Sequence, residues 1–479
     1  MRGRAYNSSM PVSPKTYQPQ PAILELGPEF FDAVEPAHFP EGKLRFFNET
    51  WAKCVGLESL TAEERKNHFW KFAPLPGNLE KPLALRYHGH QFRHYNPDLG
   101  DGRGFLFAQL KDDRGRLLDL GTKGSGQTPY SRRGDGRLTL KGAVREVLAT
   151  ETLEALGVNT SKTFAVFETG ENLERNDEPS PTRSAVLTRL NHSHIRFGTF
   201  QRLMTLKKNE EIPKLVSYCL RHYLPEADAS TPETIRFLSA VTVRAARLAA
   251  QWIVSGFVHG VLNTDNMNIT GESFDYGPYR FLPQYDPSFT AAYFDQSGLY
   301  AYGRQPETVL WNLERLADTL LPFAEREELI SALELFAPAF NKQAVAQMSE
   351  QLGLAPSEDE SLLLAVFEFL AASQIEYPQF FFDWYGGNLS RERAKKSPAA
   401  EKYQGSEFEA FLKAIENREP NENAKKQIGS AYFAQTKPCS MLIDEIEWIW
   451  SAIAVEDDWS RFENKLKEIK EMKAAYGRN

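Results

Sequence analysis

Cysteine is scarce in this sequence. Only Cys54, Cys219 and Cys439 occur among its 479 residues, and no two of them are spaced as C-x-x-C. This scarcity excludes a disulfide framework and a thiolate zinc site, and it is typical of proteins in a reducing compartment. We therefore expect a cytoplasmic protein, or a mitochondrial one if the source is a eukaryote.

Apolar runs of membrane-spanning length are also missing. The longest candidate covers residues 362–372, is interrupted by Glu368, and follows an acidic helix start at residues 357–360. A transmembrane helix needs about 20 predominantly apolar residues. The segment therefore predicts a buried helix, and we expect no membrane partner.

Positive charge is in deficit. The chain has 56 Lys and Arg against 64 Asp and Glu, which gives a formal net charge of −8. A protein that binds a long polyanion usually has a broad basic face, so nucleic acid is not an expected partner. A local basic cluster can still bind the phosphates of a nucleotide in an acidic protein.

The order of the patterns predicts an α+β fold with two lobes. Residues 1–24 contain four prolines and no acid, which indicates a flexible arm. Residues 25–190 are expected to form a sheet-rich N-lobe, with a hairpin over 105–123 and a helix over 138–156. Residues 191–479 are expected to form a helical C-lobe with a carboxyl-terminal helical extension.

Two further strands and one long helix complete the expected framework. The strands cover 163–168 and 185–190, and the stretch 172–182 between them is rich in Asn, Asp, Glu and Pro, which indicates an exposed loop. The helix begins at Thr231, a cap residue followed by proline, and ends near Gly256.

A glycine-rich segment, LGDGRG at residues 99–104, stands directly before the hairpin. Its three glycines allow backbone N–H groups to turn toward a phosphate, and Arg103 adds a planar positive group. On its own the segment is more typical of an ordinary glycine turn that opens a hairpin.

A second segment combines a lysine with glycines. Lys123 ends the second strand of the expected hairpin, KGSG covers 123–126, and YSRRGDGR follows at 130–137. A strand lysine that faces a glycine loop can neutralise phosphate charge, and Glu146 on the next helix is placed to orient it. The order of glycine and lysine excludes a Walker A motif. Without context, a surface lysine and a routine helix glutamate are the simpler interpretation.

A third segment has the spacing of a kinase catalytic loop. Asn266 follows His259 by seven residues, and the later triplet at 275–277 (DYG) stands where kinases have Asp-Phe-Gly. The acid that kinases place two residues after the histidine is replaced by Val261, whereas an acid reappears as Asp265. The alternative is a helix-end loop with turn-forming Asn and Asp.

Two arginines and three histidines are the remaining candidate site residues. Arg189 and Arg196 flank residues 191–194 and are placed to reach phosphates from the lobe junction, although single arginines more often form salt bridges. His88, His90 and His94 have metal-ligand spacing, but no cysteine or carboxylate supports a zinc site, so packing and hydrogen-bonding roles are favoured.

Taken together and in this order, these segments closely resemble the selenoprotein O family of pseudokinases, also called the YdiU family. The resemblance covers about residues 20 to 325. The segments that carry it are YHGHQF at 87–92, LGDGR at 99–103, TKGSG at 122–126, TPYSR at 128–132, GDGR at 134–137, HIRFG at 194–198, GFVHGVLNTDNM at 256–267 and FDYGP at 274–278.

The resemblance implies a protein kinase-like fold that binds ATP in a flipped orientation and transfers AMP to protein hydroxyl groups. It implies Asp265 as the proton acceptor, Asn266 and Asp275 as ligands of Mg²⁺ or Mn²⁺, and Glu146 as the residue that holds Lys123. The residues implied in nucleotide binding are Gly100, Gly102, Arg103, Lys123, Asp135, Gly136, Arg189, Arg196 and Asp275.

The sequence departs from the family pattern in two places. Arg93 stands where the family often has glycine, and the chain ends at Asn479 without the usual terminal cysteine or selenocysteine. Three alternatives to AMP transfer stay open: ordinary phosphotransfer, which would need an acid at Val261; transfer of UMP from UTP with Mn²⁺; and nucleotide binding without catalysis. The last is disfavoured because Lys123, Glu146, Asp265, Asn266 and Asp275 are all retained.

Overall fold

The computed structural model describes residues 16–176, 178–227 and 229–478. The chain divides into two compact units. The amino-terminal unit comprises Met1–His90, His94–Ala143 and Ser161–Glu226, and the helical unit comprises Gln91–Arg93, Val144–Thr160 and Ala227–Asn479. Of the flexible arm predicted over residues 1–24, residues 1–15 lie outside the described residues, whereas residues 18–19 form a strand and residues 22–24 belong to a short helix.

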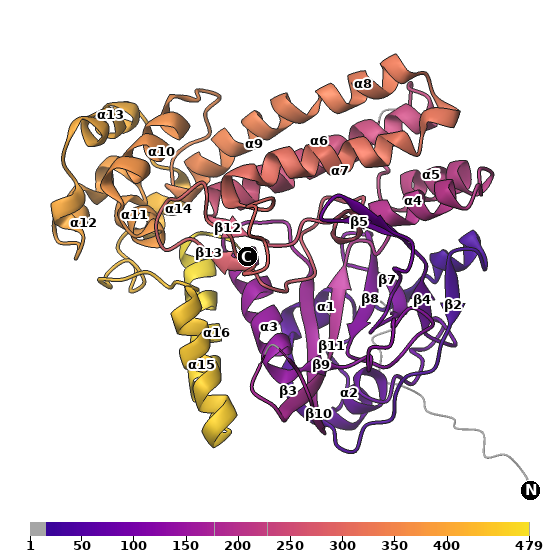
Figure 1. Ribbon diagram of the computed structural model, residues 1–479. Helices are drawn as coiled ribbons and strands as arrows, with labels where there is room; N and C mark the ends of the chain where they lie inside the picture. Colours follow the sequence, from indigo (N-terminus) through magenta and orange to yellow (C-terminus); the bar gives the residue numbers. More distant parts are fainter. Residues whose placement is uncertain (1–15, 177, 228, 479) are drawn as a thin grey trace, which may run out of the picture. The chain divides into compact units, whose positions relative to one another are not determined.

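The amino-terminal unit is built on a nine-stranded sheet in the order β2-β4-β7-β8-β11-β10-β3, with β1 paired to β7 and β9 paired to β11 (Figure 1). Its strands are β1 (Gln18–Pro19), β2 (Phe31–Ala33), β3 (Lys43–Phe47), β4 (Leu83–Leu85), β7 (Leu106–Lys111), β8 (Leu117–Lys123), β9 (Leu138–Thr139), β10 (Lys162–Leu173) and β11 (Thr182–Asn191). A separate two-stranded ladder joins β5 (Gly89–Gln91) to β6 (His94–Asn96). The helices of this unit are η1 (Ala22–Leu26), α1 (Glu49–Cys54), α2 (Ala62–Phe69), α4 (Phe197–Thr205) and α5 (Glu211–His222).

The predicted hairpin over residues 105–123 is confirmed as β7 and β8, which pair antiparallel. The turn between them is held by the carboxylate of Asp112, which accepts hydrogen bonds from the backbone N–H groups of Arg114 and Arg116 at 3.0 and 2.8 Å. Gly115 in this turn has a φ of +76°, a left-handed conformation that glycine adopts without strain. This hairpin places Lys123 at the last position of β8.

The strands β10 and β11 are longer than the predicted strands. They pair from Lys162 opposite Leu190 to Leu173 opposite Thr182, with an irregularity between Glu168 and Asn172. The loop predicted over 172–182 is therefore shorter. The two ends of the polar stretch continue the sheet, since Asn172 lies opposite Arg183 and Leu173 lies opposite Thr182.

The helix α3 (Leu140–Ala155) confirms the helix predicted over 138–156. Its apolar residues at helical spacing, Val144, Val147, Leu148 and Leu153, are at most 2% exposed. The helix is followed by Gly157, whose φ of +77° is typical of the position just after a helix. From Val144 onward α3 belongs to the helical unit.

The helical unit is organised around α6 (Glu233–Val254). This helix packs against α7 (Gln305–Asp318), α8 (Arg326–Glu334) and α9 (Phe336–Gln351) (Figure 1). Among the described residues, α6 is the one helix long and apolar enough to cross a membrane, but 61% of its most apolar stretch is buried inside the protein. Burial of this kind is expected of a core helix.

The remaining elements of the helical unit follow α6 along the chain. They are β12 (Phe257–Val258), η2 (Thr264–Asn266), β13 (Arg280–Phe281), η3 (Tyr302–Arg304), α7 (Gln305–Asp318), η4 (Leu321–Phe323), α8 (Arg326–Glu334), α9 (Phe336–Gln351), α10 (Ser361–Ser373), α11 (Tyr377–Trp384), η5 (Gly387–Ser390), α12 (Arg391–Lys395), η6 (Ala400–Lys402), α13 (Ser406–Ile415), α14 (Glu422–Gln427), α15 (Ile443–Glu456) and α16 (Ser460–Ala475). The chain is therefore a mixed α+β protein, with an antiparallel sheet in its amino-terminal half and a helical carboxyl-terminal half, as predicted.

Candidate active site

The glycine segment at 99–104 packs closely against residues 128–131 of the amino-terminal unit. A Cβ atom added to Gly100 would lie 2.3 Å from the ring of Tyr130, and one added to Gly102 would lie 2.8 Å from the Tyr130 carbonyl. The Ser131 hydroxyl donates to the Gly102 carbonyl at 2.5 Å. Close packing thus explains the two glycines, and it leaves the side chain of Arg103 exposed.

Lys123 lies where two glycine segments meet. The backbone N–H of Gly124 donates to the Arg103 carbonyl at 2.7 Å, and the N–H of Ser125 donates to the same oxygen at 3.3 Å. The side chain of Lys123 is buried, with 5% of the residue exposed. Burial of this degree is unusual for lysine, which is almost never fully buried unless it is paired.

Lys123 and Arg189 share one face of the sheet. In the β8–β11 register, Lys123 lies opposite Leu187 and Arg189 lies opposite Gly121. Residues opposite each other in a sheet point to the same face, and so do residues two apart on one strand. The ring of His194 covers Gly121 on this face, since a Cβ there would lie 2.3 Å from His194 Nε2.

Arg196 is the residue just before α4, at its N-cap, and belongs to a buried group of charges. Its guanidinium lies over the ring of Tyr87 at 4.5 Å, and its Nη2 is 3.6 Å from Asp101 Oδ1. Burial raises the pKa of Asp101, while Arg196, His194 and Arg189 oppose that rise. Asp101 was not among the predicted site residues, because it stands inside the glycine segment as an ordinary turn residue.

Asp135 and Gly136 have different surroundings. Gly136 has a φ of +69°, its carbonyl accepts from the N–H of Gly126 at 3.1 Å, and a Cβ would lie 2.2 Å from the Gly126 carbonyl carbon. Asp135 forms an ion pair with Arg175 at 2.8 Å. Burial raises the pKa of Asp135, but hydrogen bonds from Arg175 and from the backbone of Arg137 outweigh it and leave that pKa below its usual value. The nucleotide-binding role of Asp135 stays a prediction.

In the helical unit, His259 links the two loops that carry the predicted catalytic and metal-binding residues. Its Nε2 lies 2.8 Å from the carbonyl oxygen of Phe274, the residue before Asp275. Its backbone N–H donates to Gln305 Oε1 at 3.0 Å. A carbonyl only accepts hydrogen bonds, so Nε2 carries the proton.

Asp265 and Asn266 lie on the short helix η2. Asp265 is 8% exposed. The side-chain Nδ2 of Asn266 donates to the carbonyl of Val261 at 3.0 Å, and its backbone N–H donates to the carbonyl of Asn263 at 2.9 Å. Because the amide nitrogen donates to Val261, the amide oxygen Oδ1 points away from the Val261 carbonyl.

Asp275 has a left-handed backbone with a φ of +64°, and its carbonyl accepts from the N–H of Gly277 at 3.0 Å. This conformation is uncommon for residues other than glycine, although Asp and Asn adopt it more readily than most. The resulting tight turn presents a partly exposed carboxylate.

The oxygen donors of Asn266 and Asp275 fit a hard divalent cation. Mg²⁺ takes carboxylate and carbonyl oxygens and keeps several waters, so two protein ligands are enough beside a bound nucleotide. Within the described part of the chain, no group of three His, Cys, Asp or Glu side chains is placed to hold a metal ion. His88 Nδ1 lies 2.6 Å from the Tyr95 hydroxyl, and His90 Nδ1 lies 2.9 Å from Gln201 Nε2.

Glu146 lies on α3 and is 1% exposed. Burial raises the pKa of Tyr279 to about 12, and Glu146 contributes to that rise; it also contributes to the raised pKa of Tyr276. Glu146 is therefore electrostatically close to the segment that follows Asp275. The pairing of Glu146 with Lys123 joins residues of different units and stays a prediction.

Asn263 was also not among the predicted site residues. Its Oδ1 accepts from the Tyr300 hydroxyl at 2.5 Å and from the backbone N–H of Phe92 at 3.1 Å. Burial raises the pKa of Tyr300, and Asp265 adds to that rise. Asn263 thus fixes the start of η2, through partners that are far away in the sequence.

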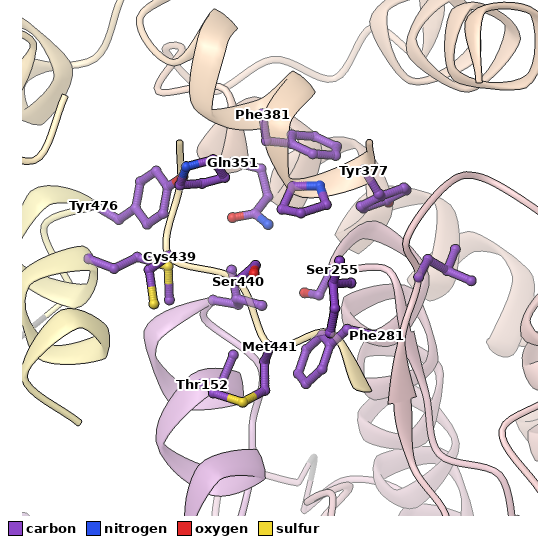
Figure 2. Close-up of a pocket in the computed structure, with 16 residues that line it drawn as sticks. Thr152, Ser255, Phe281, Gln351, Tyr377, Phe381, Cys439, Ser440, Met441 and Tyr476 are labelled. Carbon is purple, nitrogen blue, oxygen red and sulfur yellow. The ribbon is translucent and has the colours of Figure 1, made fainter. Parts of the chain in front are cut away.

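A small cavity in the helical unit contains none of the predicted site residues. Its volume is about 50 Å³, and Figure 2 shows it among side chains of α3, α11 and the stretch before α15. Thr152, Ser255, Phe281 and Tyr377 are among the residues that line it. Ligand pockets for drug-sized molecules measure roughly 300–1,000 Å³, so this cavity is too small for a nucleotide.

Residues 14–470 match the family model described as protein adenylyltransferase SelO. This chain belongs to the SelO family. Among its relatives, the protein nucleotidyltransferase YdiU of Synechocystis sp. is 43% identical over 471 residues, which cover 94% of this chain and 97% of the relative. The YdiU proteins of Gloeobacter violaceus and Trichodesmium erythraeum are each 42% identical, over 94% of this chain and over 94% and 98% of their own lengths.

Family membership confirms the resemblance drawn from the motifs and extends it beyond residue 325. At one departure from the family pattern, the backbone has the conformation that favours glycine. Arg93 has a φ of +65°, a left-handed conformation in which glycine is unstrained. Arg93 also contacts Trp311, with 5.4 Å from its guanidinium to the ring.

Replacement of Gly136 by alanine tests the close contact between Gly126 and Gly136. We expect Gly136→Ala to weaken ATP binding by roughly tenfold or more, because the new Cβ would overlap Gly126 and the left-handed backbone adds strain. Gly115→Ala is the matched control: Gly115 has a similar φ of +76°, but nothing lies within 4 Å of its added Cβ. Equal ATP affinities in the two variants, measured by calorimetry, would contradict a binding role for the contact between Gly126 and Gly136.

Proposed function

We propose that this chain transfers AMP from ATP to the hydroxyl groups of Ser, Thr or Tyr side chains in other proteins and releases pyrophosphate. The observation that carries the proposal is the family match over residues 14–470. The antiparallel sheet of one unit and the helices of the other support a protein kinase-like fold.

The positions of the basic residues support attack at the α-phosphorus. In that reaction, the acceptor oxygen forms a bond to the α-phosphorus and the bond to the oxygen that bridges to the β-phosphorus breaks. Pyrophosphate then leaves with its negative charge. Lys123 and Arg189, buried on one face of the sheet, together with Arg103 and Arg196, would stabilise that charge.

Asp265 is the proposed proton acceptor for the attacking hydroxyl. It stands directly before Asn266, and Asn263 fixes the helical turn that carries it. The position that holds the catalytic aspartate of protein kinases, which acts as the base, is Val261, and valine has no group able to take a proton. Ordinary phosphotransfer is therefore the weaker candidate.

Asn266 Oδ1 and the Asp275 carboxylate would hold the divalent cation, Mg²⁺ or Mn²⁺. When bound, the cation neutralises phosphate charge and orients the phosphates. Glu146 would hold Lys123. The glycines 100, 102 and 136 would allow the backbone to approach the phosphates.

Transfer of UMP from UTP is a second candidate. The relatives carry the name nucleotidyltransferase, which specifies no base. The proposed phosphate and metal contacts do not involve the base, so they serve either nucleotide. Competition between ATP and UTP in the presence of Mg²⁺ or Mn²⁺ separates the two candidates.

ATP labelled at either the α- or the γ-phosphorus tests the proposed reaction. We expect the α-label to become covalently attached to protein, with a mass gain of one AMP, because pyrophosphate is the leaving group. The γ-label should be released with the pyrophosphate. Attachment of the γ-label alone would mean that the chain is a conventional kinase.

Substitution of Asp265 tests its role. We expect Asp265→Ala to lower turnover by roughly a hundredfold or more, in the range of positioned acid–base groups, with a much smaller change in ATP affinity. Asp265→Asn keeps the shape but loses basicity, so it should be nearly as damaging. If the Asn variant turned over at a near-normal rate, Asp265 would be a structural loop residue and the base would lie elsewhere.

A further inference from the structure

Arg145 contacts the segment that follows Asp275. It stands directly before Glu146 on α3, and its Nη2 donates to the carbonyls of Gly277 and Tyr279 at 3.3 and 3.2 Å. Its guanidinium lies over the ring of Tyr279 at 4.7 Å. In return, the Tyr279 hydroxyl donates to the Arg145 carbonyl at 2.8 Å.

These contacts join α3 to the metal-binding turn. Three hydrogen bonds and a cation–π contact connect one helix residue to two residues that follow Asp275 within four positions. Hydrogen bonds from an ionised donor are about twice as strong as those between neutral groups. The ring of Tyr279 is fully buried, so its place beneath the guanidinium is fixed by packing.

The turn at Asp275 needs such support. Asp275 has a left-handed φ of +64°. Gly277, two residues further along the chain, is exposed. A non-glycine residue in this conformation persists only where the surrounding structure holds it. The carbonyls of Gly277 and Tyr279 accept from Arg145 on the carboxyl-terminal side of the turn, while His259 binds the Phe274 carbonyl on its amino-terminal side.

We propose that Arg145 is a positioning residue that holds the Asp275 turn in its metal-binding conformation and connects it to the helix that carries Glu146. The proposal rests on the proposed function, because that function assigns Asp275 to the metal. Arg145 itself contacts neither the nucleotide nor the metal in this account. It acts on the metal through the backbone of residues 277–279.

Arg280 on β13 provides a matched control. Its Nη1 donates to the carbonyls of Pro278 and Tyr279 at 3.1 and 2.9 Å. Both acceptors are the residues immediately before Arg280 in the chain. Loss of this side chain therefore removes two bonds within the segment but leaves the bonds between the segment and α3.

The test uses the full chain with Arg145→Ala, Arg145→Lys and Arg280→Ala. Binding of Mn²⁺ in the presence of ATP is measured from the free-ion electron paramagnetic resonance signal, and amide exchange of residues 274–281 is measured in the metal-free protein. We expect Arg145→Ala to weaken Mn²⁺ binding by roughly tenfold or more, as for other residues that orient metal ligands. Exchange of residues 274–281 should accelerate by a similar factor.

Arg280→Ala should change Mn²⁺ binding by less than about twofold. Arg145→Lys keeps the charge but loses the planar fork, so it should lie between wild type and Arg145→Ala. It also preserves the test if the alanine variant fails to fold. A loss of stability alone would lower the active fraction and leave the Mn²⁺ midpoint of the folded protein unchanged.

Equal Mn²⁺ midpoints in wild type, Arg145→Ala and Arg145→Lys would overturn the proposal, and so would equal shifts in Arg145→Ala and Arg280→Ala. Failure of the proposed function gives a different result. In that case wild-type protein would attach no α-label from ATP, whereas the binding and exchange measurements would still report on Arg145.

Discussion

The hydrogen bond from His259 Nε2 to the Phe274 carbonyl fixes the arrangement on which the proposed chemistry depends. His259 is 1% exposed, and its ring packs against Trp252 and Tyr276 with centroid separations of 5.6 and 5.9 Å. The bond joins the start of the loop that carries Asp265 to the residue before Asp275. A buried carbonyl that lost this donor would incur a desolvation cost of about 1–3 kcal/mol, so the two loops are held in one geometry.

Charged groups are buried in both units at the positions assigned to chemistry. In the amino-terminal unit these groups are Lys123, Arg189 and Arg196, and in the helical unit they are Glu146 and Asp265. Such burial is costly unless each group is paired or serves a function. Packing of apolar side chains alone does not require it. The residues assigned to chemistry thus include five buried charged side chains.

The sequence predicted the elements whose signals are local. The alternating hairpin that ends at Lys123 and the helical spacing that carries Glu146 both depend on neighbouring residues, and both are present. Asn263 and Arg145 could not be found in this way. The bond from Phe92 to Asn263 spans 171 positions, and the bond from Arg145 to Gly277 spans 132. The ion pair of Asp135 with Arg175 was hidden for the same reason, since Arg175 stood in a stretch predicted to be an exposed loop.

A crystal structure of the chain with Mg²⁺ and α,β-methylene ATP would show whether Asn266 and Asp275 bind the metal. The bridging methylene group prevents cleavage, so the complex persists. We expect Mg²⁺ at about 2.1 Å from Asn266 Oδ1 and from an Asp275 carboxylate oxygen, with the α-phosphorus facing Asp265. A metal ion bound to the nucleotide without contact to either residue would contradict this expectation.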